Sequence, residues 1–120
     1  MESEELKLFS KKEEFSGATY HGLLILVENG AIALLQRGEK PKLGTMAFAT
    51  PPSLVGAGIA ASAVLVGERH ATLARVLSER LATALNRLAI VSINAREDDP
   101  PQPFIAICAG LLEDAKGVRR

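Results

Sequence analysis

The amino-acid sequence predicts an α+β fold, in which an antiparallel β-sandwich-like sheet of six to seven strands carries one long and one short helix in the C-terminal half. Apolar runs separated by short turns fill the first half of the 120-residue chain. A helical spacing of apolar residues begins only after residue 70. A chain of this length has room for one core, so we expect a single domain over residues 1–120.

The first half of the chain is expected to supply five strands. They cover residues 6–14, 19–27, 31–35, 43–50 and 60–66. The first strand is half-polar and typical of a sheet edge, whereas the second centres on the apolar run from Leu23 to Val27. The Asn29-Gly30 pair that follows predicts a tight hairpin, because both residues tolerate a positive φ.

The second half is expected to add a long helix, two strands and a short helix. Apolar residues spaced three and four positions apart, from Leu73 to Leu88, define one helical face. On that face Leu77 and Leu81 are the expected core anchors. Strands are expected at residues 89–95 and 104–108, and a short helix at residues 111–116.

Several of the expected strands are apolar on both faces. In residues 23–27 and 31–35, the side chains that point in either direction are hydrophobic. A strand of this kind has to be covered on both sides. Two helices can cover one face of a sheet, so a second sheet layer or another chain must cover the other. We therefore expect a dimer, formed by the chain with itself or with a like-folded chain.

Charge balance and cysteine content argue against several classes of protein. Basic and acidic residues number 14 each, so the chain lacks the basic excess that binding a phosphate backbone requires, and we expect no nucleic-acid partner. Pro51 and Pro52 interrupt the uncharged span 43–67, so we expect no membrane span. Cys108 is the single cysteine, which excludes an internal disulfide. The acidic N-terminus is unlike a signal peptide, so we expect a cytoplasmic protein.

The sequence carries no pattern of catalytic or metal-binding residues. His21 and His70 are the only histidines, and they lack the spacing of a zinc-binding helix. Glu97, Asp98 and Asp99 are adjacent on an expected loop, which fits a solvated charge run better than a calcium loop. We therefore expect no enzymatic activity, no metal and no cofactor.

Two charged loops are the expected partner-binding surface. Both adjoin strands and are bracketed by Gly or Pro, and binding residues concentrate in loops that a rigid scaffold positions. Their opposite charges would orient a charged partner and speed its association. The candidate residues are Arg37, Lys40 and Lys42 in the first loop and Arg96, Glu97, Asp98 and Asp99 in the second. The simpler interpretation is that both loops are ordinary solvated turns.

Residues 43–116 resemble a known family. The order of their segments is VLVG at residues 64–67, LSERLA at 77–82, AIVSIN at 89–94, FIAI at 104–107 and LLE at 111–113. This order is similar to that of the small proteasome assembly chaperones of the third/fourth type, and most of all to the fourth. The resemblance implies a non-catalytic domain that pairs with a like-folded chain. It also implies that the pair binds an α-type subunit of the 20S core particle while its ring is built.

Two other functions remain open at this point. A dimeric interaction module of the profilin-like or roadblock-like kind would share the absence of catalytic residues, but it would place a helix early in the chain. A small-ligand-binding domain would use residues 56–62 and His70, and it would form a concave pocket there.

Overall fold

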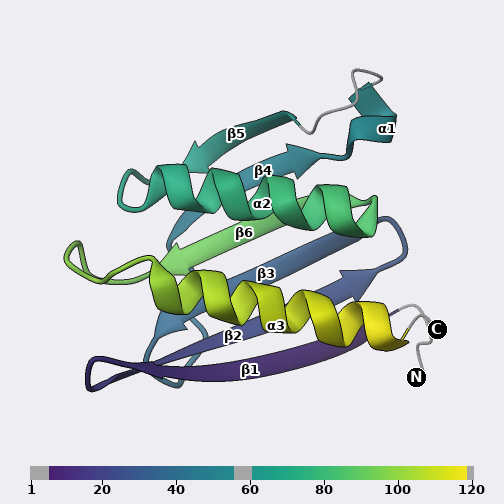
Figure 1. Ribbon diagram of the computed structural model, residues 1–120. Coiled ribbons are helices and arrows are strands. Elements are labelled where there is room, and N and C mark those ends of the chain that lie inside the picture. The colour runs from purple at the N-terminus through teal and green to yellow at the C-terminus, as the bar shows by residue number, and fades with distance from the viewer. Residues whose placement is uncertain (1–5, 56–60, 119–120) are drawn as a thin grey trace.

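A computed structural model describes residues 6–55 and 61–118 of the chain. In these residues a six-stranded sheet has two helices packed on one of its faces, as Figure 1 shows. The strands are β1 (Lys7–Phe15), β2 (Ala18–Val27), β3 (Gly30–Arg37), β4 (Thr45–Thr50), β5 (Ala61–Val66) and β6 (Leu88–Asn94). The helices are α1 (Pro52–Val55), α2 (Ala71–Leu85) and α3 (Gln102–Val118). The expected α+β class is confirmed.

The strand order in the sheet is β1-β2-β3-β6-β4-β5. Every neighbouring pair is antiparallel, as expected, except β3 and β6, which run parallel, so the sheet is mixed and mostly antiparallel. The cause is α2, which crosses the sheet from β5 and returns the chain as β6 beside β4. A crossover of this kind delivers a strand in the direction of the one it left. The other side of β6 then pairs with β3.

Two tight hairpins join the first three strands. The β1–β2 turn lies at Ser16 and Gly17, whose φ angles of 52° and 79° are those that a type I′ hairpin turn requires at both central positions. The expected β2–β3 hairpin is confirmed, but its turn falls at Glu28 and Asn29. Gly30 already belongs to β3, and neither it nor Asn29 has a positive φ. The Asn29-Gly30 pair therefore predicted the hairpin correctly, but the positive φ expected at these two residues is wrong.

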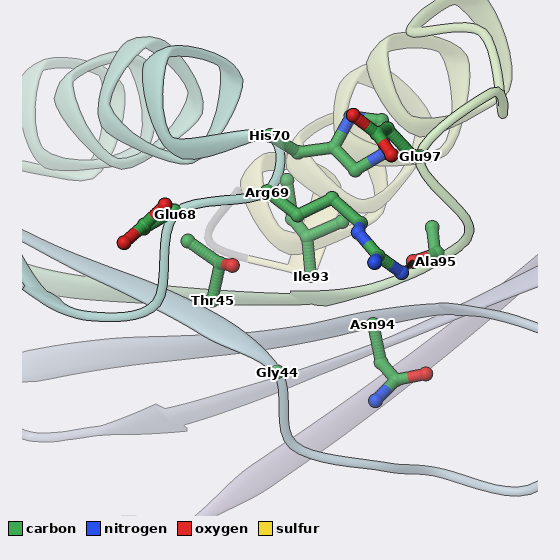
Figure 2. A pocket seen from close by; sticks show the side chains of 9 residues that line it. All are labelled: Gly44, Thr45, Glu68, Arg69, His70, Ile93, Asn94, Ala95 and Glu97. Atoms are coloured by element: carbon green, nitrogen blue, oxygen red, sulfur yellow. Dashed lines mark hydrogen bonds between the residues drawn. The ribbon is translucent and has the colours of Figure 1, made fainter.

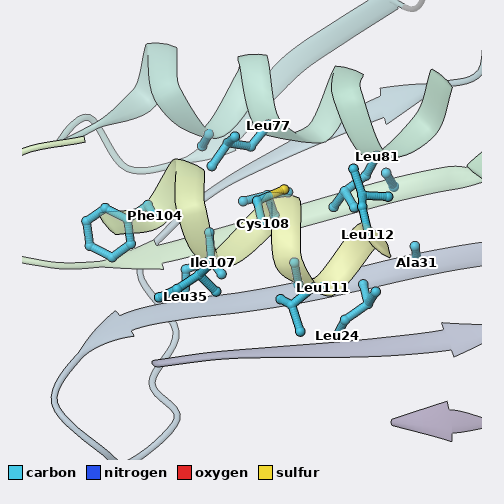
Figure 3. Close-up of a cluster of buried hydrophobic side chains, with 14 of the residues drawn as sticks. Leu24, Ala31, Leu35, Leu77, Leu81, Phe104, Ile107, Cys108, Leu111 and Leu112 are labelled. Carbon is cyan, nitrogen blue, oxygen red and sulfur yellow. The ribbon is translucent and has the colours of Figure 1, made fainter. Parts of the chain in front are cut away.

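The hydrophobic core lies between the sheet and the two helices (Figure 3). The helix α2 packs on β4, β5 and β6, while α3 packs on β1, β2 and β3. Leu77 and Leu81 of α2 are fully buried, as expected from their spacing. Val76 was expected on the same face but is 44% exposed. Ser78, beside Leu77, is also buried, and its hydroxyl donates to the Arg75 carbonyl.

The last apolar segment forms a helix and not a strand. The expected strand at 104–108 and the expected short helix at 111–116 are both parts of the 17-residue helix α3. Its buried side chains follow spacings of three and one, which is one face of a helix. They are Pro103, Phe104, Ile107, Cys108, Leu111, Leu112 and Ala115. Pro103 fits in the first turn, where a missing N–H leaves no bond unmade.

The helix α3 approaches the sheet closely at Gly22 of β2. A Cβ atom at this position would lie 2.3 Å from Ile107 and 2.8 Å from Leu35. A side chain at residue 22 would therefore push α3 away from β2.

None of the helices in residues 6–55 and 61–118 combines the length and apolar character needed to cross a bilayer.

We expect Leu77→Ala and Leu81→Ala each to lower the free energy of unfolding by about 2–5 kcal/mol, because each would leave a cavity in a close-packed core. Urea denaturation followed by circular dichroism measures this change. Val76→Ala, on the exposed side of the same helix, is the matched control and should shift the urea midpoint little. Equal midpoints for all three variants would contradict the burial of Leu77 and Leu81.

Candidate protein-binding surfaces

The face of the sheet opposite the helices carries a row of apolar side chains. Residues that face each other across neighbouring strands form this row, because side chains in register point to the same face. From β1 to β5 the row is Leu8, Ile25, Ile32, Ile90, Phe48 and Ala63. A second row adds Leu23, Leu34 and Met46 beside it. We call this surface, formed by both rows, the open face.

The open face is uncharged across most of its width. On β2, β3, β6, β4 and β5, none of the described side chains that point to this face is Asp, Glu, Lys or Arg. Charges appear at the β1 edge, at Lys12 and Glu14. At the other edge, Leu65 and Val66 are 56% and 55% exposed. Large uncharged apolar surfaces of this kind mark sites of protein interaction.

The two loops predicted from their charges meet at one end of the sheet. The Nη1 atom of Arg37, at the end of β3, donates to Oδ1 of Asp99 over 2.6 Å. The hydroxyl of Tyr20 on β2 donates to the same oxygen over 2.8 Å, and the backbone N–H of Arg96 donates to Oδ2 over 2.7 Å. The Asp99 side chain is 2% exposed. Arg37 and Asp99 therefore join the two loops to each other.

The hydrogen bonds around Asp99 decide its ionisation. Burial by itself raises the pKa of this carboxyl group, but the bonds from Tyr20, the Arg96 backbone and Arg37 outweigh burial and hold its pKa below the ordinary value. Burial and the bond to Asp99 raise the pKa of Tyr20 above its ordinary value. At neutral pH the site therefore holds a carboxylate, a guanidinium and a neutral phenol, and this combination satisfies the carboxylate oxygens.

The other predicted residues remain on the surface of the same end. Lys40, Lys42, Arg96, Glu97 and Asp98 are exposed. Hydrogen bonds anchor the first loop to β6, where the Gly44 N–H donates to the Ser92 hydroxyl and the Asn94 amide donates to the Leu43 carbonyl. Sequence reasoning did not identify Tyr20, since nothing in its apolar surroundings on β2 signals a polar bond to residue 99.

A polar pocket of about 720 Å³ lies beside these loops, where β4 begins and where β5 and β6 end (Figure 2). Its walls include Thr45, Arg69, His70 and Asn94. The His70 ring nitrogen Nε2 lies 2.7 Å from the Arg96 carbonyl, which places this ring over the second loop. The sequence had suggested His70 and residues 56–62 as a ligand site. His70 does line a pocket, whereas the Ser62 hydroxyl on β5 bonds Glu79 instead, and residues 56–60 lie outside the described residues.

The described side chains offer little for a metal or for covalent chemistry. Residues 6–55 and 61–118 bring together no group of three or more His, Cys, Asp or Glu side chains that could hold a metal ion. Burial raises the pKa of the Cys108 thiol to about 11. At neutral pH this thiol is therefore protonated, and a buried thiol is a poor nucleophile.

We expect Asp99→Asn to lower the free energy of unfolding by about 1–3 kcal/mol at pH 7, because it removes a buried charge that several donors bond. The pKa of Asp99 is lower in the folded than in the unfolded state. Its contribution is therefore complete above the unfolded-state pKa of about 3.9 and is lost as the pH falls through the folded-state pKa. Urea titrations between pH 7 and pH 3 should show the parent and the variant converging. Asp98→Asn, on an exposed neighbour, is the control, and a constant difference at every pH would contradict the role of the charge.

No protein-family model matches the sequence, and a search of curated proteins finds no similar sequence. A search of solved structures finds the same fold in a chain of a chaperone complex for yeast 20S proteasome assembly. The alignment covers 95% of this chain and 94% of that one, with a TM-score of 0.63 and 15% sequence identity. At this identity the likeness shows the fold alone. The chain therefore shares its architecture, over nearly its whole length, with a chain of that complex.

Proposed function

We propose that this chain is a non-catalytic assembly chaperone that binds an α-type subunit of the 20S proteasome core while its ring is built in the cytoplasm. The observation that supports this proposal most directly is the open face, an apolar sheet surface on the side that α2 and α3 do not cover. The likeness of the whole fold to a chain of a proteasome assembly chaperone complex is the reason for relating that surface to proteasome assembly.

The open face supports pairing with a like-folded chain. Two sheets pack face to face about 10 Å apart when both inner faces are apolar, and the resulting layer resembles the core of a β-sandwich. An uncharged face meets a second copy without like-charge repulsion. Ile32 and Ile90 lie at the centre of the open face, so pairing there would remove them from water. Burial of apolar surface contributes about 25 cal/mol per Å², which makes this face the main source of association energy.

The charged loops support contact with the client subunit. Once the open face is occupied by a partner and the opposite face by α2 and α3, the ends of the strands remain accessible. Lys40, Lys42, Glu97 and Asp98 are exposed at one such end. Arg37 and Asp99 hold the two loops together there. We propose that these residues give orientation and a fast on-rate against a charged surface of the α-type subunit.

Profilin-like and roadblock-like modules fit the chain less well. They would place a helix early in the chain, whereas here five strands and the single-turn helix α1 precede α2. A generic protein-interaction module with the present fold stays as the alternative if binding to proteasome subunits fails.

We expect the parent chain to dimerise at micromolar concentration and Ile32→Glu to weaken the dimer by at least about tenfold, because the variant places a charge in the centre of an apolar interface. Sedimentation equilibrium measures both dissociation constants. Val76→Glu, which adds the same charge on the exposed side of α2, should dimerise like the parent. A parent chain that stays monomeric at high micromolar concentration would rule out self-pairing, and an unaffected Ile32→Glu dimer would rule out the open face.

We expect charge reversal in the loops to weaken binding to a purified α-type subunit. One variant combines Lys40→Glu with Lys42→Glu, and the other combines Glu97→Lys with Asp98→Lys. Arg37 and Asp99 stay unchanged because their substitution would also destabilise the fold. Surface plasmon resonance should show a lower on-rate for at least one variant, with the larger difference at low salt. If both variants bind like the parent, the loops are not the client site, and if the parent binds no α-type subunit the chaperone assignment fails.

A further inference from the structure

The loop that joins β3 to β4 lies over one end of the open face. This loop, residues 38–44, has to pass β6, which lies between the two strands that it joins. Ser92 and Asn94 lie two and four residues after Ile90 on β6, so they also point to the open face. Both bond the loop backbone, over 2.8 Å and 2.9 Å. In Figure 2, Asn94 points away from the helices, on the side from which the chain reaches Gly44. We call residues 38–44 the ridge.

The burial of the open-face side chains changes along β3. Ile32 and Leu34 are half-buried, whereas Gln36, two residues further on, is 2% exposed. A side chain of this size is buried on a sheet surface only when other atoms lie over it. Its register neighbour His21 contacts the ridge, with Nδ1 2.8 Å from the Gly38 carbonyl oxygen. The ridge therefore covers the open face where β3 ends, and Ile32 lies clear of it.

The two ends of the open face differ in charge. Lys40 and Lys42 are exposed on the ridge, with Glu39 as the one acidic residue among them. At the opposite end of the sheet, β2 and β3 are joined by the turn at Glu28 and Asn29, and both residues are exposed. We call this the turn end. The open face thus runs from a raised, basic segment to a tight turn that carries an acidic residue.

These features restrict how a second copy of the chain can pack on the open face. Packed sheets lie about 10 Å apart and their side chains fill the gap, so one chain segment fits between them at any point but two do not. A two-fold axis along the strands would stack ridge on ridge and bring Lys40 and Lys42 against their own images. An axis across the strands instead places each ridge at the other copy's turn end, where the Glu28 charge is opposite.

We propose that the open face receives a second copy of this chain with its strands reversed, so that the two ridges lie at opposite ends of the paired sheets. The proposal rests on the proposed function to the extent that the copies pair through the open face. The surface is self-complementary in this arrangement, because each copy offers one ridge and one turn end. The dimer then carries one set of charged loops at each end, and its two client surfaces face apart.

Distances between spin labels on the two copies of the full chain distinguish the two axes. Glu39→Cys places a label on the ridge, and Asn29→Cys places one at the turn end. The native Cys108 is buried and its pKa is raised to about 11, so the label reacts with the introduced cysteine. Double electron–electron resonance should give at least about 26 Å between two labels at residue 39, and likewise at residue 29, because the eight residues of β3 separate the ends. Mixed dimers with one label at each position should give a shorter distance than either.

A charge exchange tests the same arrangement without labels. Glu28→Lys should weaken the dimer by about two- to fivefold at low salt, because it brings a positive charge to the partner's ridge. Adding Lys40→Glu and Lys42→Glu to this variant should restore the parent dissociation constant. Sedimentation equilibrium measures all three, and it also checks that Glu39→Cys and Asn29→Cys pair like the parent.

The outcomes separate this proposal from the proposed function. A dimer whose labels at residue 39 lie closer together than those of the mixed dimer has ridge against ridge, which overturns the reversed arrangement and keeps the pairing. A charge exchange that fails to restore pairing also counts against the reversed arrangement. A monomeric parent chain rejects self-pairing and this proposal together. A reversed dimer that binds no α-type subunit keeps the arrangement and rejects the proteasome assignment.

Discussion

The central strands of this sheet carry apolar side chains on both faces, and the described helices cover one of them. Folding removes the first set of side chains from water beneath α2 and α3, which supplies most of the favourable free energy. The second set gains nothing from the helices and stays half-buried among its neighbours on the open face. This imbalance leaves an apolar surface on the side of the sheet that α2 and α3 do not cover. On the described strands, the side chains that point to the open face are charged only at the β1 edge, at Lys12 and Glu14, and the loops and the pocket lie at the strand ends.

Much of the architecture could be predicted from local patterns in the sequence. Alternating and continuous apolar runs located all five N-terminal strands, and the spacing of Leu77 and Leu81 located the long helix. The last helix was missed because Phe104 and its two isoleucine neighbours favour a strand locally. The repeat that continues through Leu111 and Ala115 outweighs that preference, because it buries a whole helical face on the sheet. No local sequence pattern predicts the parallel pairing of β3 with β6. This pairing depends on the position in the sheet to which the crossover through α2 returns the chain.

The candidate sites show a similar division between what is local and what is not. Charge, glycine and proline were enough to identify both loops as exposed and close to strand ends. That Arg37 would bond Asp99 could not be predicted, because the two residues come together through the pairing of β3 with β6. Thr45 and Arg69 likewise belong to one pocket only because β4 and the start of α2 meet at the same end of the sheet. The spacing of these residues in the sequence does not indicate that the two segments lie together.

The position of β6 has a consequence for how the chain acquires its structure during synthesis. This strand is the last in the sequence, yet it lies in the middle of the sheet, between β3 and β4. Until it leaves the ribosome, the β1–β3 meander and the β4–β5 hairpin have no strand to connect them. Pairing between strands that are distant in the sequence is slow. Until it is complete, the unpaired apolar strand edges can associate with other chains. A protein proposed to guide the assembly of others is thus most vulnerable to misassociation just before its own final strand is made.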